Sequence, residues 1–325
     1  MKALRAELPK ALSKPRPVDD ASRLAAPECA PITEFLHFSG GAGATLQQHS
    51  IAAPPPVADG SVRVVCIADT HNEHASLHLP AGDVLIHAGD CLTESGERHV
   101  RRSGATLEVR PAGVELFVSF ASWLARQPHA HKVLIGGNHD LVLEALGAAR
   151  VQQILDEQTP DGLEPPIWLE HTAASVGGLI IFGSPYAAYG GKNLAFFARS
   201  GADFAAVPSD ADVVVTHMPC VLPDGDGSAT EDARLADALR RAKAQLHVAG
   251  HCHWAHGLHR TRAGIASVVA SASGPHYHVW SSGELRASTG WRGDARDAAS
   301  GGYNVTQLPI ACDVRVRAWM SPQGG

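Results

Sequence analysis

The nine residues KVLIGGNHD, Lys132 to Asp140, carry the pattern on which the fold prediction depends. An apolar run ending at Ile135 predicts a buried strand, and two glycines break that strand before three polar residues. The amide of Asn138, the imidazole of His139 and the carboxylate of Asp140 therefore follow a strand end directly. Taken alone, this turn has an ordinary explanation, because Asn and Asp are also favoured at helix N-caps.

The same arrangement recurs along the chain from Val62 onward. Short apolar runs alternate with helical patterns, which is typical of an α/β or layered sheet-and-helix domain. The predicted strands are Val62–Ala68, Asp83–His87, Lys132–Ile135, Leu179–Phe182, Asp212–Thr216 and Leu246–Ala249, and the predicted helices are about Val114–Arg126 and Thr230–Lys243. The second helix is expected to open with a capping box at Ser228–Glu231. All strands but Leu179–Phe182 lead into a turn bearing His or Asp, where open α/β sheets bind ligands.

Five strand ends together supply three carboxylates, one amide and five histidines. They are Asp69-Thr70-His71, Gly89-Asp90-Cys91, Gly137-Asn138-His139-Asp140, His217 and Gly250-His251-Cys252-His253. Each is common in isolation, as a solvated turn, a helix cap or a buried histidine, but the ordered set is not expected by chance. Mixed imidazole, carboxylate and amide ligands suit Mn, Fe or Zn, and the sequence has no thiolate cluster for a closed structural zinc site.

The charges of this set favour an anionic guest. A carboxylate can bridge two metal ions about 3.5–4 Å apart, the separation used in two-metal phosphoester hydrolysis. Two divalent ions bring four positive charges, whereas Asp69 and Asp90 return only two negative ones. A phosphate group is therefore the expected substrate group.

The motif series resembles the calcineurin-like metallophosphoesterase superfamily over about Val62 to His253. The segments GDVLIHAGD, SWLARQPHAHKVLIGGNHD and IIFGSPY are similar, more narrowly, to its metallophosphoesterase-domain-containing subgroup. Characterised members of that subgroup act as phosphodiesterases, including on cyclic nucleotides. The resemblance implies an α/β fold, a four-layer αββα sandwich of two mixed β-sheets flanked by helices, with the metals at one edge.

The resemblance also implies a role for each site residue. Asp69, His71 and His253 would hold the first metal together with Asp90, which would bridge to a second metal held by Asn138, His217 and His251. His139 would be the general acid, which suits an imidazole with an ordinary pKa of about 6.5, and Asp140 would orient it. A hydroxide made available by the metals would attack the phosphorus atom.

The expected function is therefore metal-dependent hydrolysis of a phosphoester, favouring a diester. The alternatives are a phosphomonoesterase or protein phosphatase and, from another class, a catalytically silent binding scaffold, which is disfavoured because every ligand position is filled. Candidate substrate contacts are Arg101, Arg102, Tyr186 and Tyr189. The two arginines belong to an apparent insertion over 91–113, and a second insertion is expected over 274–300; either could equally be a solvated loop. Cys91 and Cys252 are expected to be small fillers beside the ligands.

Proline content and charge complete the sequence predictions. Three consecutive prolines within Ala52–Gly60 predict a linker, so we expect a flexible Ala/Pro-rich tail over 1–60, a metallophosphoesterase domain over 61–318 and a tail over 319–325. The net charge of −6 gives no general attraction to nucleic acid or to an anionic membrane. No apolar run is long enough for a membrane helix, and the six cysteines form no Cys-x-x-Cys pair. We expect a cytoplasmic protein acting on a small-molecule phosphoester, with nucleotides as one candidate; an organelle address stays open, since the first thirty residues mix basic and acidic side chains.

Overall fold

The computed structural model describes residues 33–41, 43–93, 98–104, 106–186, 195–197, 203–223, 228–273 and 307–317, and the backbone of 277–279 and 285–287. The chain divides into two units, 1–30 and 31–325, and the first lies outside the described residues. Tyr189, most of the second insertion and the C-terminal tail also lie outside them. The description below concerns the second unit.

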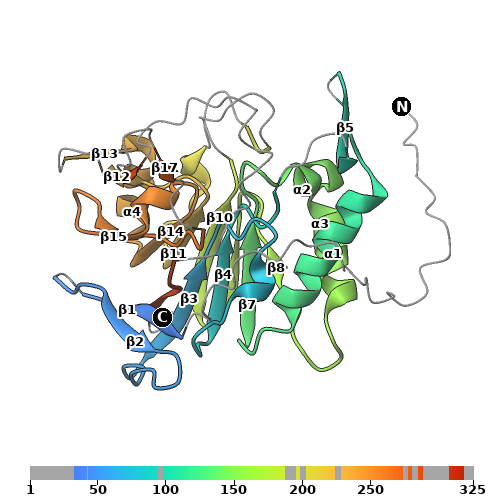
Figure 1. Ribbon diagram of the computed structural model, residues 1–325. Coiled ribbons are helices and arrows are strands. Elements are labelled where there is room, and N and C mark those ends of the chain that lie inside the picture. The colour runs from blue at the N-terminus through green and yellow to red at the C-terminus, as the bar shows by residue number, and fades with distance from the viewer. Residues whose placement is uncertain are drawn as a thin grey trace, which may run out of the picture. The chain divides into compact units, whose positions relative to one another are not determined.

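A seven-stranded mixed sheet forms one half of this unit (Figure 1). Its order is β2-β1-β19-β3-β4-β7-β8, and the strands are β1 (Glu34–Phe38), β2 (Gln47–Ser50), β3 (Ser61–Ile67), β4 (Val84–Ala88), β7 (His131–Ile135), β8 (Ile167–Trp168) and β19 (Ile310–Arg315). Strands β3, β4, β7 and β8 run parallel. The strand ends that precede Asp69, Asp90 and Asn138 therefore lie along one edge of this sheet.

A six-stranded mixed sheet forms the other half. Its order is β15-β16-β14-β11-β10-β9, and the strands are β9 (Thr172–Val176), β10 (Leu179–Ser184), β11 (Val213–Thr216), β14 (Leu246–Ala249), β15 (Gly257–Arg260) and β16 (Ala266–Val269). The central four strands, β10, β11, β14 and β16, are parallel. The ends of β11 and β14 carry His217 and His251.

The two sheets pack face to face around one apolar core. Val64 and Ile86 of the first sheet share a fully buried cluster with Val213, Val215 and Val248 of the second. Neighbouring side chains on the central strands, such as Val65 and Val214, lie in the outer clusters that the helices cover, so the central strands are buried on both sides. This double burial explains why they read as continuous apolar runs rather than as an alternating pattern.

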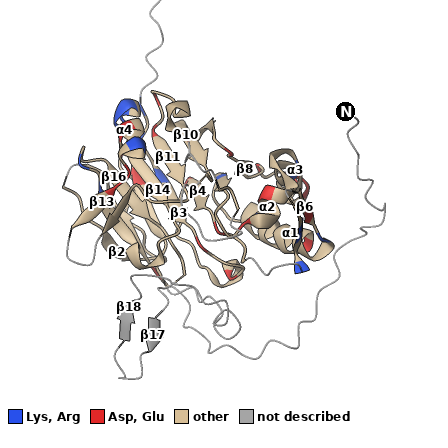
Figure 2. Cartoon of the chain, turned by 90° about the horizontal axis from the view of Figure 1, so that it is seen from above, with Lys and Arg blue, Asp and Glu red and all other residues tan. Residues whose placement is uncertain are grey.

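Helices form the two outer layers. Helices α1 (Pro111–Ala125), α2 (Leu141–Leu146) and α3 (Ala148–Gln158) pack on the first sheet, and α4 (Ala233–Ala242) packs on the second. Figure 2 shows these two helical groups on opposite sides of the sheets. The order helix, sheet, sheet, helix confirms the predicted four-layer sandwich.

Two predicted helix starts are wrong. Helix α1 begins at Pro111 rather than Val114, because proline is well suited to the first helical turn. Helix α4 begins at Ala233, and the side chain of Asp232 caps it by accepting N–H groups from Arg234 at 2.9 Å and Leu235 at 3.1 Å. The predicted capping box is instead mostly a strand, since β13 (Ala229–Glu231) pairs with β12 (Val221–Pro223).

The N-terminal boundary of the domain also needs correction. Strands β1 and β2 lie within the predicted flexible tail, yet they extend the first sheet through a parallel pairing of β1 with β19. Phe35 is fully buried, and the prolines of the predicted linker contribute the Pro55 carbonyl as an acceptor for Arg63 Nη1 at 2.7 Å. The folded domain therefore begins well before residue 61.

Part of the first insertion is a hairpin rather than an irregular loop. Strands β5 (Val100–Ser103) and β6 (Thr106–Val109) pair antiparallel. Val100 is buried with Leu141 and Val142, so the hairpin packs on α2, which starts directly after Asp140. In the second insertion, β17 (Tyr277–Val279) and β18 (Leu285–Ala287) form another hairpin. Among the helices of the described residues, none has the length and apolar character needed to cross a bilayer.

Candidate metal centre

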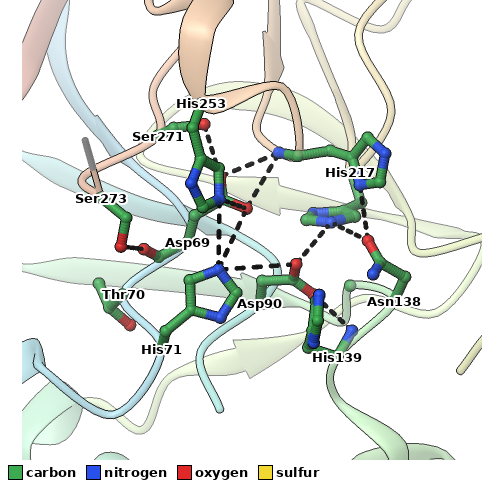
Figure 3. Close-up of polar contacts among 12 residues, drawn as sticks. Asp69, Thr70, His71, Asp90, Asn138, His139, His217, His253, Ser271 and Ser273 are labelled. Carbon is green, nitrogen blue, oxygen red and sulfur yellow. Dashed lines mark hydrogen bonds and ion pairs between the residues drawn. The ribbon is translucent and has the colours of Figure 1, made fainter. Parts of the chain in front are cut away.

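The predicted ligands meet at the edge where the carboxyl ends of both sheets come together (Figure 3). Asp69, Asp90 and Asn138 follow β3, β4 and β7 of the first sheet, and His217 and His251 follow β11 and β14 of the second. The structure thus brings all seven predicted ligands into one cluster. We divide them into a first group, Asp69, His71 and His253, and a second group, Asp90, His217 and His251 with Asn138.

In the first group, three donor atoms converge on one point. His253 Nε2 lies 3.4 Å from Asp69 Oδ1, and His71 Nε2 lies 4.0 Å from the same oxygen and 3.3 Å from His253 Nε2. The Nδ1 atom of His71 is 3.3 Å from the Leu92 carbonyl, to which it donates. This bond leaves the lone pair on Nε2, which is the atom that faces the group.

In the second group, His217 occupies the centre. Its Nε2 lies 3.2 Å from Asp90 Oδ2 and 3.0 Å from Asn138 Oδ1, and its Nδ1 donates to the Ala88 carbonyl at 2.9 Å. His251 presents Nδ1 to the same Asn138 oxygen at 2.6 Å. The amide oxygen of Asn138 therefore points at the two imidazoles, as a shared ligand position requires.

Asp90 connects the two groups. Its Oδ2 atom lies 3.2 Å from His217 Nε2 in the second group and 4.0 Å from His71 Nε2 in the first. Its Oδ1 atom accepts the backbone N–H of His139 at 2.7 Å, which fixes the orientation of the carboxylate. One oxygen is thus anchored to the chain while the other faces both groups.

The pKa shifts in the cluster show that its buried carboxylates are stabilised by nearby positive charge. Burial raises the pKa of Asp69, but the imidazole of His253 outweighs it and the pKa lies well below its usual range. Burial also raises the pKa of Asp90, which His217 then lowers well below the ordinary value. Burial lowers the pKa of His217, yet Asp90 raises it to about 10. In the chain alone a proton on His217 balances the carboxylates, and metal cations would replace that proton.

Unusual backbone conformations are concentrated in the ligand turns. Asp69, His71, Asp90 and His251 have φ values of 54°, 43°, 55° and 65°, a region that non-glycine residues rarely occupy. Such conformations cost free energy, persist only where the surroundings impose them, and cluster at functional sites. The turns are therefore shaped to present these side chains.

Two motif glycines allow the close approach of the ligand carboxylates. A Cβ atom at Gly137 would lie 2.3 Å from Asp90 Oδ1, and one at Gly250 would lie 2.5 Å from Asp69 Oδ2. Any side chain at either position would displace a carboxylate. The glycines of the Gly-Asn-His-Asp and Gly-His-Cys-His turns are thus part of the site.

Asp140 is fully buried and supports the second group through the backbone. Its Oδ2 accepts N–H groups from Gly137 at 2.7 Å and Asp90 at 2.8 Å, and its Oδ1 accepts the N–H of Leu92 at 2.9 Å. These bonds tie the turn after β7 to the turn after β4. The structure therefore shows that Asp140 holds these two turns together, whereas its expected role in orienting His139 stays a prediction.

Two serines of the site escaped the sequence prediction. Ser271 Oγ donates to Asp69 Oδ2 at 2.7 Å, and Ser273 Oγ donates to the Asp69 carbonyl at 2.7 Å; both serines are fully buried. The backbone N–H of His251 is shared by both oxygens of that carboxylate, Oδ2 at 2.9 Å and Oδ1 at 3.0 Å. Only Oδ2 accepts the Ser271 hydroxyl, and Oδ1 is the oxygen that lies toward His71 and His253, at 4.0 Å and 3.4 Å. One sequence feature could have indicated these serines. The apolar run of β16 leads into Ser271-Ala272-Ser273, just as the other strands lead into Asp or His.

The predicted substrate residues have different surroundings. Arg101 and Arg102 are exposed on β5, on the hairpin that packs against α2. Tyr186 donates its hydroxyl to Glu170 Oε1 at 2.9 Å and packs its ring against His171 and Phe196. Cys91 and Cys252 are buried beside the ligands and belong to neither metal-binding group.

Comparison with known proteins agrees with this geometry. The sequence profile described as calcineurin-like phosphoesterase matches residues 62–255. A UPF0046 protein of Caenorhabditis elegans is 31% identical over 222 residues, which are 64% of this chain and 69% of that protein. Metallophosphoesterase domain-containing protein 1 of Homo sapiens is 29% identical over 232 residues, 65% of each chain. A probable rhamnogalacturonate lyase C of Emericella nidulans is 32% identical over 235 residues, which are 70% of this chain but 20% of that protein. With the profile covering more than half of its length, the chain belongs to the calcineurin-like phosphoesterase family.

Proposed function

We propose that the protein is a dinuclear metal-dependent phosphoesterase that hydrolyses phosphodiesters, with cyclic nucleotides as candidate substrates. The position of Asp90 Oδ2 between the two groups, 3.2 Å from His217 Nε2 and 4.0 Å from His71 Nε2, is the observation that supports it most directly. A carboxylate oxygen placed between two donor sets is the arrangement needed to bridge two metal ions.

The donor chemistry fits divalent metals of the Mn, Fe or Zn type. Each group combines imidazole nitrogens with carboxylate or amide oxygens, and in each group the donor atoms of the carboxylate and the two imidazoles lie within 4.8 Å of one another. His71 and His217 hold their outer ring nitrogens on backbone carbonyls, which orients the inner nitrogens as ligands. When bound, the metals would supply Lewis acidity and lower the pKa of water.

In this proposal, His139 acts on the leaving group. Its backbone N–H is held by Asp90 Oδ1, and its ring meets the ring of His71 edge-on at a centroid distance of 5.1 Å. His139 is only partly buried, so it remains accessible to solvent while its ring lies beside a ligand of the first group. In the proposed reaction, the imidazolium of His139 donates a proton to the departing ester oxygen.

Two features support a phosphodiester as substrate. The excess of metal charge over the charges of Asp69 and Asp90 favours a phosphate, and Arg101 and Arg102 offer exposed guanidinium groups for a second substituent. The relative named metallophosphoesterase domain-containing protein is consistent with phosphoester chemistry. The choice of diester over monoester rests on these two arginines and on the resemblance of the motif segments.

The test combines metal analysis with leaving-group chemistry. The active protein should contain two metal ions per chain, and chelation should abolish hydrolysis. His139→Ala should keep both ions and lower kcat by about 10²–10⁴, with a smaller loss on nitrophenyl esters, which need little protonation. His131→Ala, at the opposite end of β7, is the matched control and should retain wild-type kcat.

Three outcomes would contradict the proposal. One ion or none would rule out the two-metal reaction, and equal losses on good and poor leaving groups would remove His139 from the acid role. A clearly higher kcat/KM for nitrophenyl phosphate than for bis-nitrophenyl phosphate and 2′,3′-cyclic nucleotides would make the protein a monoesterase.

A further inference from the structure

Two fully buried histidines, one in each sheet, lie behind the metal-binding groups without belonging to them. His87 is on β4 and His247 is on β14. Each ring presents Nε2 to a threonine hydroxyl, His87 to Thr70 at 3.0 Å and His247 to Thr216 at 2.9 Å. The two sheets thus contain the same contact.

Both threonines are chain neighbours of predicted metal ligands. Thr70 lies between Asp69 and His71 of the first group, and Thr216 directly precedes His217 of the second. Each threonine is joined to a ligand by one peptide bond, so a hydrogen bond that holds the threonine also restricts the position of that ligand. Figure 3 shows Thr70 beside Asp69 and His71.

In the second sheet, the direction of the hydrogen bonds can be followed from end to end. Thr216 donates its only hydroxyl proton to the Met218 carbonyl at 2.5 Å, so His247 Nε2 must donate to Thr216 Oγ1. His247 Nδ1 then accepts from Ser267 Oγ at 2.8 Å. The hydrogen bond from Thr216 to the Met218 carbonyl joins the residues on either side of His217, so it fixes the backbone that carries this ligand.

In the first sheet, Thr70 joins two ligand turns. Its hydroxyl donates to the Cys91 carbonyl at 3.4 Å, and the same carbonyl accepts the backbone N–H of Asn72 at 3.0 Å. Because that bond uses the only hydroxyl proton of Thr70, His87 Nε2 is the donor in the contact with Thr70 Oγ1. The contact therefore links the Asp69 turn to the turn that carries Asp90.

His87 makes this contact at a cost to stability. Its Nδ1 is buried without a hydrogen-bond partner among the described residues, and its ring packs edge-on against Phe120 at a centroid distance of 5.0 Å. An unsatisfied polar atom in an apolar core destabilises the folded state, so an apolar side chain would suit this position better. The bond to Thr70 is the compensating interaction.

We propose that His87 and His247 are positioning residues that set the geometry of the two metal-binding groups, the first group through Thr70 and the second through Thr216. The inference rests on the proposed binding of two metals. It assigns the two histidines no contact with substrate or metal. Partners that hydrogen-bond directly to metal ligands typically lower metal affinity by about 10- to 100-fold when they are lost, and we expect an effect of this size from these two histidines.

The test measures metal affinity separately from activity. Mn²⁺ is titrated calorimetrically into metal-free wild type, His87→Leu and His247→Leu. Each leucine variant is expected to bind Mn²⁺ about 10- to 100-fold more weakly, while metal-free His87→Leu unfolds at the wild-type urea concentration or above it. In an Asn138→Ala background, which isolates the first group, His87→Leu should keep its full effect. His247→Leu should keep its effect in a His253→Ala background, which isolates the second group.

Conservative and control variants separate positioning from packing. His87→Gln and His247→Gln keep a donor near the Nε2 position and should recover affinity to within about threefold. His129→Leu is the matched control. His129 is also buried, its Nδ1 has no hydrogen-bond partner in the part of the chain that the structure describes, and its Nε2 contacts the Pro80 carbonyl, yet it lies away from the ligands. It should bind Mn²⁺ as the wild type does.

The results distinguish this proposal from the proposed function. A wild type that binds fewer than two Mn²⁺ ions overturns both. Two ions in the wild type with unchanged affinity in both leucine variants, or an equal loss in His129→Leu, overturns the positioning role alone. If a leucine variant does not fold, Thr70→Val or Thr216→Val removes the same bond with little change in shape, and unchanged affinity there overturns the role equally.

Discussion

Replacing Asp313 with asparagine should destabilise the protein strongly, although the two side chains have nearly the same size. Asp313 on β19 lies opposite Arg63 on β3, and their side chains are 2% and 3% exposed. Asp313 Oδ1 accepts from Arg63 Nε at 2.9 Å, and Oδ2 accepts from Nη2 at 3.1 Å. Oδ2 also lies 3.0 Å from His37 Nε2, which ties β1 to the same carboxylate.

The expected loss follows from these contacts. An amide at position 313 carries no charge and would turn an N–H group toward Arg63 or His37, since both carboxylate oxygens act as acceptors. Breaking one partner of a buried ion pair lowers the free energy of unfolding by about 3–5 kcal/mol. In a domain of this size, about 1 kcal/mol corresponds to about 2–4 °C in Tm, so Tm should fall by about 6–20 °C.

Urea unfolding of the metal-free protein, followed by circular dichroism at neutral pH, measures this loss. Asp237→Asn is the matched control, because Asp237 pairs with Arg240 and Arg241 on the exposed face of α4 and should contribute little. Arg63→Met/Asp313→Leu should recover much of the stability, since buried ion pairs can often be replaced by apolar contacts. A loss below about 1 kcal/mol for Asp313→Asn, the size expected of an exposed pair, would refute the inference that β1 and the proline segment are packed into the domain through this cluster.

Three further predictions concern the metal centre and its surroundings. Asn138→Ala should reduce the metal content of purified protein from two ions toward one, and unchanged content would remove Asn138 from the ligand set. Burial lowers the pKa of His247 to about 3, so below pH 6.5 the unfolded state binds a proton that the folded state does not. The stability of the metal-free protein should therefore fall as the pH drops below about 6.5, and it should fall less steeply in His247→Gln. Urea midpoints measured across this pH range make the comparison. Arg101→Ala/Arg102→Ala should lower kcat/KM on 2′,3′-cyclic nucleotides by about two- to fivefold, the size of an exposed ion pair, and no change would show that the hairpin does not contact substrate.

The central strands could be predicted from the sequence because their signal is local. The apolar runs near Val62 and Leu246 are long enough to be buried and end in turn residues, and the observed strands β3 and β14 agree to within one residue. Strands β1 and β2 were not predicted, because Gln47–Ser50 is polar and exposed, and β1 is stabilised by β19, which lies far away in the chain. The start of α4 was wrong because Asp232 competed with Ser228 for the cap, and the pairing of β13 with β12 decided between them.

In the site, too, local features could be predicted from the sequence and long-range contacts could not. Asp69, Asp90 and Asn138 could be named because each follows a recognisable strand. The hydrogen bond from Ser271 to Asp69 could not be predicted, because the two residues are 202 positions apart in the chain. They meet through the β-bridge between Ala68 and Ser271. The hydrogen bonds from backbone N–H groups to Asp140 were likewise not predicted, because Asp140 was interpreted only as a partner of its neighbour His139.

By itself, the sequence determined which chemical groups stand at the strand ends, because strand and turn preferences and motif spacing act over a few residues. Only the tertiary structure decided which of these groups meet. His71 and His253 are 182 residues apart in the chain, and their Nε2 atoms lie 3.3 Å apart because two sheets pack face to face with their parallel strands ending at a common edge. That packing depends on burying the apolar faces of both sheets at once, which no local stretch of sequence specifies.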